Sequence, residues 1–362
     1  MIRLLIVDDS PLMRRLLRDI FAAEEDFAIE IANDAAAALA LLPVFEPDVI
    51  TLDIHMPGMN GLACLDRIMV ERPCPVVMIS SLTAEGADET LEAMALGAVD
   101  FVAKPRGPVS IEIETMVPML VAKVRAAAGA KLSRTIRLAD RVRLRTAQPR
   151  LAPKRQPRVA VHANKPVAPG SAEGLVLVGT STGGPAALDI LLTALPADFP
   201  WPIAIAQHMP ASFTGALARR LDRICPLSIV EVSKATPLVA GHAYIGRGDA
   251  DLIISRRAGV LTAMAAPSAA ELHWHPSVDR LVNSAMQHVA PERLVGVLMT
   301  GMGADGARAM ADLANRGGQT IAESEDSAVV WGMPGSLVAL GGADHVVPLP
   351  DIAGRLMSLI GS

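Results

Sequence analysis

The amino-acid sequence predicts an α/β fold with two domains. Short apolar runs alternate with helical patterns through most of the 362 residues, and this alternation is typical of parallel sheets covered by helices. A chain of this length can form two domains with separate cores. From residue 123 to 170, 13 side chains are basic and one is acidic, which is typical of a solvated linker. We therefore expect domains at 1–122 and 173–362, joined by a basic linker at 123–172.

The composition argues against several classes of protein. A formal net charge of -5 does not favour a nucleic-acid binder. Three widely spaced cysteines form neither a disulfide framework nor a zinc pattern, as is usual in the reducing cytoplasm. The apolar run at the N-terminus is too short for a signal peptide, and no run approaches the roughly 18 apolar residues of a membrane span. We expect a cytoplasmic protein that is not inserted in a membrane.

Five apolar runs predict the strands of the first domain, at residues 4–7, 29–32, 49–53, 76–80 and 100–104. A helix should begin after Ser10 at Pro11, because serine caps helices and proline is favoured in their first turn. Another should end at Gly97, since glycine is the usual helix stop. These elements predict a five-stranded parallel sheet, whose ligands bind at the carboxyl ends of the strands.

Polar side chains lie at the carboxyl ends of four of these five strands, namely Asp8, Asp9, Asp53, Ser80 and Lys104. Three carboxylates at one edge repel each other unless a hard cation lies between them, and Mg²⁺ takes such oxygen ligands. A lysine and a hydroxyl beside them suit a phosphoryl group. The alternative is that the acids cap the following helices, which accounts for one acid but not for the set.

Residues 1 to about 120 resemble the receiver domain of two-component response regulators, which has a flavodoxin-like fold. The resemblance implies that Asp53 is the phosphoacceptor. It implies that Asp8 and Asp9 hold Mg²⁺ together with Asp53 and the backbone carbonyl of His55.

The same resemblance assigns the groups that contact the phosphoryl oxygens. Ser80 would contact them and Lys104 would pair with them. Spacing alone leaves Ser81 as an alternative to Ser80. Phe101 lies where receivers carry a switch aromatic, and ordinary core packing is an equal explanation.

Nine further runs predict strands in the second domain, at residues 175–179, 203–206, 228–232, 243–245, 252–256, 261–265, 294–300, 320–323 and 346–348. Helical patterns follow Pro276 and cover 305–315, so this domain should also be doubly wound α/β. The stretch 244–265 has little helical period and should form a β-hairpin.

Ser181 lies in the stretch 175–185, which reads LVLVGTSTGGP. A serine at such a strand-to-helix turn exposes its hydroxyl, and nearby backbone N–H groups can stabilise an oxyanion. Such a serine can act as an acyl-transfer nucleophile. On this stretch alone, a hydroxyl that caps the following helix is the more common arrangement.

His208 and Asp305 also follow predicted strands, in the stretches QHMP and GMGADG. Taken singly, a structural histidine and a capping aspartate explain them as well as catalysis does. Strand ends of one parallel sheet meet at one edge, so the two residues and Ser181 can meet. Ser212 should cap the next helix. His273 and His275 have no apparent third ligand, so we expect no metal and no cofactor in this domain.

The motifs GTSTGG, QHMP and GMGADG, with HAYIGRG, WHPSVD and VVWGMP, are similar to those of the chemotaxis protein-glutamate methylesterase family, CheB. The resemblance implies hydrolysis of glutamate γ-methyl esters on chemotaxis receptors and deamidation of certain receptor glutamines. It implies Ser181 as nucleophile, His208 as general base and acid, and Asp305 as the residue that orients His208. The backbone at Met302 would supply part of the oxyanion hole.

The resemblance also implies partners and regulation. Methyl-accepting receptors would be the substrate and a histidine kinase of the CheA type the phosphodonor, with the chain acting as a monomer. We expect the receiver to cover the active-site edge until Asp53 is phosphorylated.

Two other functions stay open at this point. The same triad could act on other esters or amides. A DNA-binding response regulator could use its basic linker, although the second domain has no recognisable helix-turn-helix.

Overall fold

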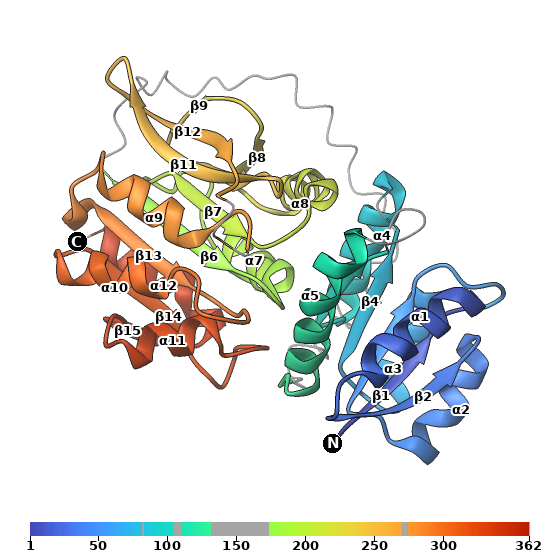
Figure 1. Ribbon diagram of the computed structural model, residues 1–362. Coiled ribbons are helices and arrows are strands. Elements are labelled where there is room, and N and C mark those ends of the chain that lie inside the picture. The colour runs from blue at the N-terminus through green and yellow to red at the C-terminus, as the bar shows by residue number, and fades with distance from the viewer. Residues whose placement is uncertain (82, 105–110, 132–173, 270–271, 273, 362) are drawn as a thin grey trace.

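The computed structural model describes residues 1–81, 83–104, 111–131, 174–269, 272 and 274–361, and it confirms an α/β fold with two parallel sheets (Figure 1). The first sheet has five strands and the second has seven. A separate three-stranded antiparallel sheet lies on the second domain. No helix in these described ranges is long and apolar enough to cross a membrane.

The first domain has the strand order β2-β1-β3-β4-β5, with every pair parallel. This is the doubly wound order of flavodoxin-like folds, whose ligand crevice lies where β1 and β3 meet. The strands are β1 (Ile2–Val7), β2 (Phe27–Ala32), β3 (Val49–Asp53), β4 (Val76–Ser80) and β5 (Asp100–Ala103). The helices are α1 (Pro11–Ala22), α2 (Ala35–Phe45), α3 (Gly61–Glu71), α4 (Ala84–Leu96) and α5 (Ile111–Ala128).

Local sequence signals set the ends of these helices. Ser10 is the N-cap of α1, where its hydroxyl accepts from the Met13 N–H at 3.4 Å. Gly97 ends α4 with a φ of 108°, a left-handed conformation that side chains with a Cβ rarely adopt. Both features agree with the sequence-based expectation.

The second domain is built on the sheet order β15-β14-β13-β6-β7-β10-β8, with every pair parallel. Its strands are β6 (Leu175–Thr180), β7 (Ile203–Gln207), β8 (Ser228–Val232), β10 (His242–Gly246), β13 (Leu294–Leu298), β14 (Gln319–Glu323) and β15 (His345–Val347). Its helices are α7 (Gly184–Thr193), α8 (Ala211–Ile224), α9 (Val278–Met286), α10 (Ala307–Asn315), α11 (Met333–Ala339) and α12 (Ile352–Ile360). Short 3-10 turns, η1 (Pro291–Arg293) and η2 (Leu349–Asp351), precede β13 and α12.

The hairpin is shorter than expected. It consists of β11 (Ala250–Arg257) and β12 (Val260–Pro267), and a two-residue strand that the sequence did not predict, β9 (Thr236–Pro237), extends it. Tyr244 belongs instead to β10 in the large sheet. Its side chain is buried and its hydroxyl donates to the Pro237 carbonyl at 2.9 Å, so it ties the two sheets together.

The last helix of the first domain runs past the expected boundary at residue 122. α5 continues to Ala128, because two basic residues counted with the linker are anchored to the first domain. Lys123 is buried and donates to Asp100 at 2.8 Å, and Arg125 forms an ion pair with Asp26 at 2.8 Å. The rest of the linker, 132–172, lies outside the described residues.

The first domain contacts the second through α4, through Phe101 of β5 and through Lys131, which follows α5. Figure 1 shows α4 and α5 on the side of the first domain that faces the second. α4 packs against α7 and α8. Phe101 of β5 lies against Phe213 of α8 with ring centroids 4.4 Å apart. Lys131, just after α5, pairs with Glu325 at 3.0 Å. Phe101 is therefore both buried and part of the interface.

Candidate phosphorylation and active sites

The acidic cluster of the first domain forms as predicted at the ends of β1 and β3. One carboxylate oxygen from each of Asp8, Asp9 and Asp53 lies within 4.8 Å of the others. Lys104 Nζ lies 2.8 Å from Asp53 Oδ2 and 3.1 Å from Asp8 Oδ2. Asp8 Oδ2 is buried, and its contact with Lys104 is an ion pair without the geometry of a hydrogen bond. Such a donor set fits Mg²⁺, which takes carboxylate oxygens and waters.

The surroundings of Asp53 disfavour the charged form of its carboxyl, which a bound cation would offset. Burial raises the pKa of Asp53, the nearby Asp8 charge adds to the rise, and Lys104 opposes it. A divalent cation would favour the charged carboxylate that attacks a phosphoryl group.

Ser80 and Ser81 have different environments. Ser80 is 1% exposed, and its hydroxyl accepts from Thr90 at 2.7 Å and donates to the Gly86 carbonyl at 3.2 Å. The hydroxyl of Ser81 is 3.2 Å from that of Thr83. The Ser80 hydroxyl therefore bonds to α4, on the side of the domain that contacts α8.

The second domain carries its three predicted site residues after neighbouring strands. Ser181 follows β6, His208 follows β7, and Asp305 comes after β13, on the other side of β6. Ser181 is not a helix cap, because α7 begins at Gly184 and its N-cap is Gly183, without a side-chain hydrogen bond. The strand-to-helix turn thus leaves the serine hydroxyl without a capping role.

His208 and Asp305 are hydrogen-bonded to each other. His208 Nε2 lies 2.8 Å from Asp305 Oδ2, and both side chains are largely buried. His208 Nδ1, the other ring nitrogen, is buried without a hydrogen-bond partner among the described residues. The ring is therefore held by one nitrogen and has the other available for a reacting group.

Asp305 is held by the start of α9 rather than capping its own helix. It accepts from the N–H groups of Val278 and Asp279 at 2.7 and 3.1 Å, and from the Ser277 hydroxyl at 3.1 Å. Burial alone would raise the pKa of Asp305, but the hydrogen bond and charge of His208 and these N–H groups outweigh it and lower the pKa. The carboxylate therefore stays ionised beside the imidazole.

Gln207 connects the serine turn to the histidine turn, a role the sequence analysis missed. Its buried amide nitrogen donates to the carbonyls of Ser181 and His208, at 3.0 and 3.1 Å. A Cβ added to Gly184 would lie 2.0 Å from Gln207 Oε1, so only glycine fits there. Gln207 is the first residue of the stretch QHMP, but the sequence does not indicate which groups a glutamine side chain will hydrogen-bond.

Ser181 Oγ and His208 are not hydrogen-bonded, since Nδ1 has no partner. Catalytic hydrogen bonds are often long until substrate binds.

The Ser181 N–H donates to the Thr300 carbonyl at 3.0 Å, so it is not an oxyanion donor. The predicted donor residue, Met302, follows Gly301, where an added Cβ would lie 2.7 Å from Ser181 Cβ. The Met302 backbone is thus next to the serine turn.

Two side chains from the WHPSVD stretch contribute to this edge. The Trp274 indole stacks on the His208 ring with centroids 5.6 Å apart and an interplanar angle of 12°. His275 is not a free loop residue, because its Nδ1 lies 2.9 Å from the buried carboxylate of Asp251. His273 lies outside the described residues.

Ser212 was expected to cap the helix after His208. It lies instead in the first turn of α8, whose N-cap is Pro210.

The first domain contacts the residues that directly follow Ser181. The Thr182 hydroxyl donates to Asp100 Oδ2 at 2.5 Å. The Gly183 N–H donates to the Val99 carbonyl at 3.1 Å. The N-terminus of α7 is thus capped by a carbonyl of the other domain.

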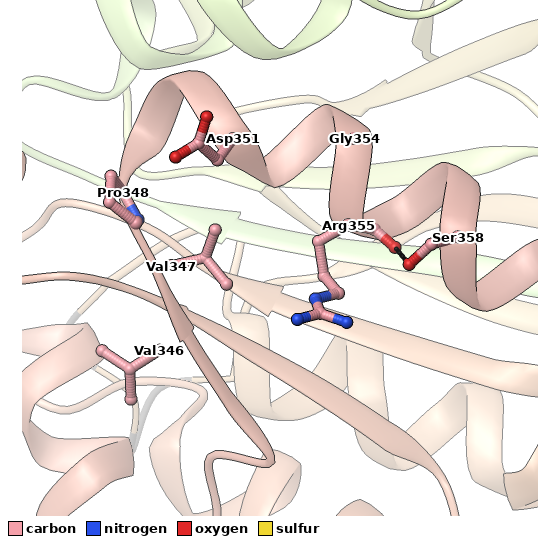
Figure 2. A pocket seen from close by; sticks show the side chains of 7 residues that line it. All are labelled: Val346, Val347, Pro348, Asp351, Gly354, Arg355 and Ser358. Atoms are coloured by element: carbon pink, nitrogen blue, oxygen red, sulfur yellow. Dashed lines mark hydrogen bonds between the residues drawn. The ribbon is translucent and has the colours of Figure 1, made fainter.

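A surface hollow of about 420 Å³ lies elsewhere, beside β15 and α12. Figure 2 shows Arg355 and Asp351 on α12 and the preceding turn, with Val346 on the strand below. β15 is the outermost strand of the sheet, whereas Ser181 follows the central strand β6. This hollow is therefore separate from the candidate active site.

Comparisons with known proteins give a consistent result. Residues 176–356 match the family model described as CheB methylesterase, and residues 4–114 match the response regulator receiver domain. A protein-glutamate methylesterase/protein-glutamine glutaminase 2 of Rhodopseudomonas palustris is 55% identical over 357 residues, covering 99% of this chain and 98% of the relative. A corresponding protein of Rhodospirillum rubrum is 51% identical over 356 residues, covering 98% and 95%.

A solved structure agrees with these matches. The crystal structure of the Thermotoga maritima CheB methylesterase catalytic domain superimposes with a TM-score of 0.50 at 35% identity, covering 51% of this chain and 98% of that one. Fold and comparisons together define a response regulator whose output domain is an enzyme. The chain belongs to the CheB methylesterase family. As a member of that family it is a carboxylic ester hydrolase with a receiver domain.

Proposed function

We propose that this chain removes methyl groups from glutamate γ-methyl esters of methyl-accepting chemotaxis receptors, and deamidates specific receptor glutamines, by a Ser181–His208–Asp305 triad. The observation that carries the triad is the 2.8 Å hydrogen bond between His208 Nε2 and Asp305, with Nδ1 buried and without a hydrogen-bond partner among the described residues. The relatives named above are methylesterases and glutaminases, which supports this substrate class.

The reaction follows from the roles of these groups. His208 Nδ1 takes the Ser181 hydroxyl proton as Oγ attacks the ester carbonyl, and Asp305 stabilises the imidazolium. The Met302 N–H stabilises the oxyanion, a contribution on the order of 3 kcal/mol for one such donor. The imidazolium returns the proton to the departing methoxide, which leaves as methanol. Water, deprotonated by His208, then cleaves the acyl-enzyme to a glutamate carboxylate and free Ser181.

We infer that the receiver controls this site. Phosphorylation of Asp53 adds about -1.5 to -2 charges at the end of β3. Asp8, Asp9, Asp53 and the His55 carbonyl would hold Mg²⁺, which neutralises charge during phosphoryl transfer.

Phosphorylation would draw Lys104 and the Ser80 hydroxyl toward the phosphoryl group and loosen the contact with the second domain. The hydrogen bonds from Thr182 and Gly183 to Asp100 and Val99 support this view, because they hold the first domain against the two residues that follow Ser181. A CheA-type histidine kinase is the proposed phosphodonor, and the cytoplasm the proposed location. The proposed state is a monomer.

The test is methanol release from a methylated receptor. Ser181→Ala should lower turnover at least about 10³-fold, because no nucleophile remains. Ser255→Ala on the hairpin strand β11 is the matched control and should keep full turnover. If Ser181→Ala retained turnover, the triad would be wrong. Faster hydrolysis of small esters than of receptor would contradict the proposed substrate.

A further inference from the structure

Glu323 is a fully buried carboxyl at the end of β14 for which the proposed mechanism has no use. β14 pairs with β13, the strand that leads to Thr300 and Gly301. Within the described part of the chain, no cationic side chain forms an ion pair with Glu323. A buried carboxyl without a cation is costly, so its retention here calls for a reason.

The two carboxyl oxygens of Glu323 have separate donors. Oε2 accepts from the Thr300 N–H at 2.8 Å, and Oε1 accepts from the Ser327 hydroxyl at 3.0 Å. The carboxyl is thus clamped between the end of β13 and the loop after β14. Burial raises its pKa to about 7, while the Thr300 and Ser327 donors oppose the rise.

Thr300 joins Glu323 to the nucleophile turn. Its carbonyl accepts from the Ser181 N–H at 3.0 Å and from the Thr180 hydroxyl at 3.1 Å. Its own hydroxyl donates to the Thr182 carbonyl at 2.9 Å. Three consecutive residues around the nucleophile are therefore hydrogen-bonded to Thr300, and the loop with Met302 begins directly after it.

We propose that Glu323 is a positioning residue for ester hydrolysis, which holds the Thr300 backbone and thereby sets Ser181 relative to the Met302 N–H. The inference rests on the proposed triad. A displacement of about 1 Å between a nucleophile and an oxyanion donor costs on the order of 10²-fold in rate. In this role the Glu323 side chain has to offer an oxygen that accepts from the Thr300 N–H, and it does not have to be negatively charged.

The experiment compares Glu323→Met with Glu323→Gln in the full-length chain, by methanol release from methylated receptor. Methionine keeps the size of the side chain but leaves the Thr300 N–H without an acceptor. We expect kcat to fall about 10–100-fold with KM changed less than about threefold. The glutamine amide oxygen still accepts from Thr300, and its nitrogen can donate to Ser327, so kcat should stay within about twofold of the original.

Thr320→Val is the matched control, because Thr320 is a buried polar residue at the other end of β14. It should lower the melting temperature and leave kcat unchanged. The proposal is overturned if Glu323→Met lowers only the melting temperature, as Thr320→Val does, or if Glu323→Gln loses as much kcat as Glu323→Met.

If Glu323→Met does not fold, Ser327→Ala replaces it, because losing the hydroxyl that holds Oε1 lets the carboxyl move and weakens its hydrogen bond to the Thr300 N–H. We expect kcat about threefold lower with KM unchanged, and an unaltered kcat would refute the proposal. Ser181→Ala separates the two claims. If Ser181→Ala still turns over receptor, the triad is wrong. If Ser181→Ala is inactive and Glu323→Met is fully active, only the role of Glu323 is wrong.

Discussion

Asp305 and Glu323 are buried carboxyls near one sheet edge whose environments shift their pKa values in opposite directions. His208 and the first N–H groups of α9 outweigh the burial of Asp305 and lower its pKa. Among the described residues, the Glu323 carboxyl accepts from two neutral donors, so burial prevails and its pKa rises to about 7.

The raised pKa of Glu323 predicts a loss of stability as pH rises. Its pKa is about 7 in the folded chain and 4.5 ordinarily, so the folded state binds the proton more tightly. Stability should therefore fall between about pH 4.5 and 7, by at most about 3 kcal/mol. Glu323→Gln lacks this titration and should be more stable than the original at pH 8 but not at pH 4.5.

Urea unfolding followed by tryptophan fluorescence measures this difference, because Trp201, Trp274 and Trp331 all lie in the second domain. Equal stability differences at pH 4.5 and 8 would contradict the assigned titration.

The sequence allowed the strand ends to be predicted but not the contacts between side chains. Ser181, His208 and Asp305 each follow an apolar run, and parallel strands place such residues at one edge. The bond from Thr182 to Asp100 joins residues 82 positions apart in two domains, and no local pattern encodes it. The same holds for Thr300 and Glu323, 23 positions apart.

At the scale of elements, β5 spans the distance between the two sites. Lys104, which contacts Asp53, follows its last residue, and Asp100, which contacts Thr182, is its first. Four residues of strand extend about 13 Å. A shift of β5 on phosphorylation would thus act on the interface directly.

The end of α5 forms a second contact that is easier to test. Lys131 and Glu325 pair at 3.0 Å and are about half exposed, so the pair contributes roughly 0.2–1 kcal/mol. Lys131→Glu places like charges together and should raise methanol release without phosphodonor about 2–5-fold. The double variant Lys131→Glu with Glu325→Lys should restore the original rate.

Lys234→Glu, at an exposed site on the second domain, is the control and should have no effect. Because salt screens exposed charges, the increase should shrink as ionic strength rises. An increase of equal size in the double variant would show that this contact does not restrain the enzyme.

The whole molecule combines two sheets of the same α/β class with different tasks (Figure 1). The five-stranded sheet carries an acidic site at its switch point, and the seven-stranded sheet carries the serine, histidine and aspartate. They meet where α4 packs against α7 and α8, and where Phe101 of β5 lies against Phe213 of α8. The residues that follow Ser181 are thus hydrogen-bonded to the receiver domain of the same chain.

The most direct measurement is methanol release by the full-length chain with and without a phosphodonor, in the original and in Asp53→Asn. We expect a low rate that rises severalfold when the phosphodonor and Mg²⁺ are added to the original chain. Asp53→Asn should show no such rise, since its amide cannot accept the phosphoryl group. An equal rise in Asp53→Asn, or a fall in the original chain, would contradict control of the active site by this receiver.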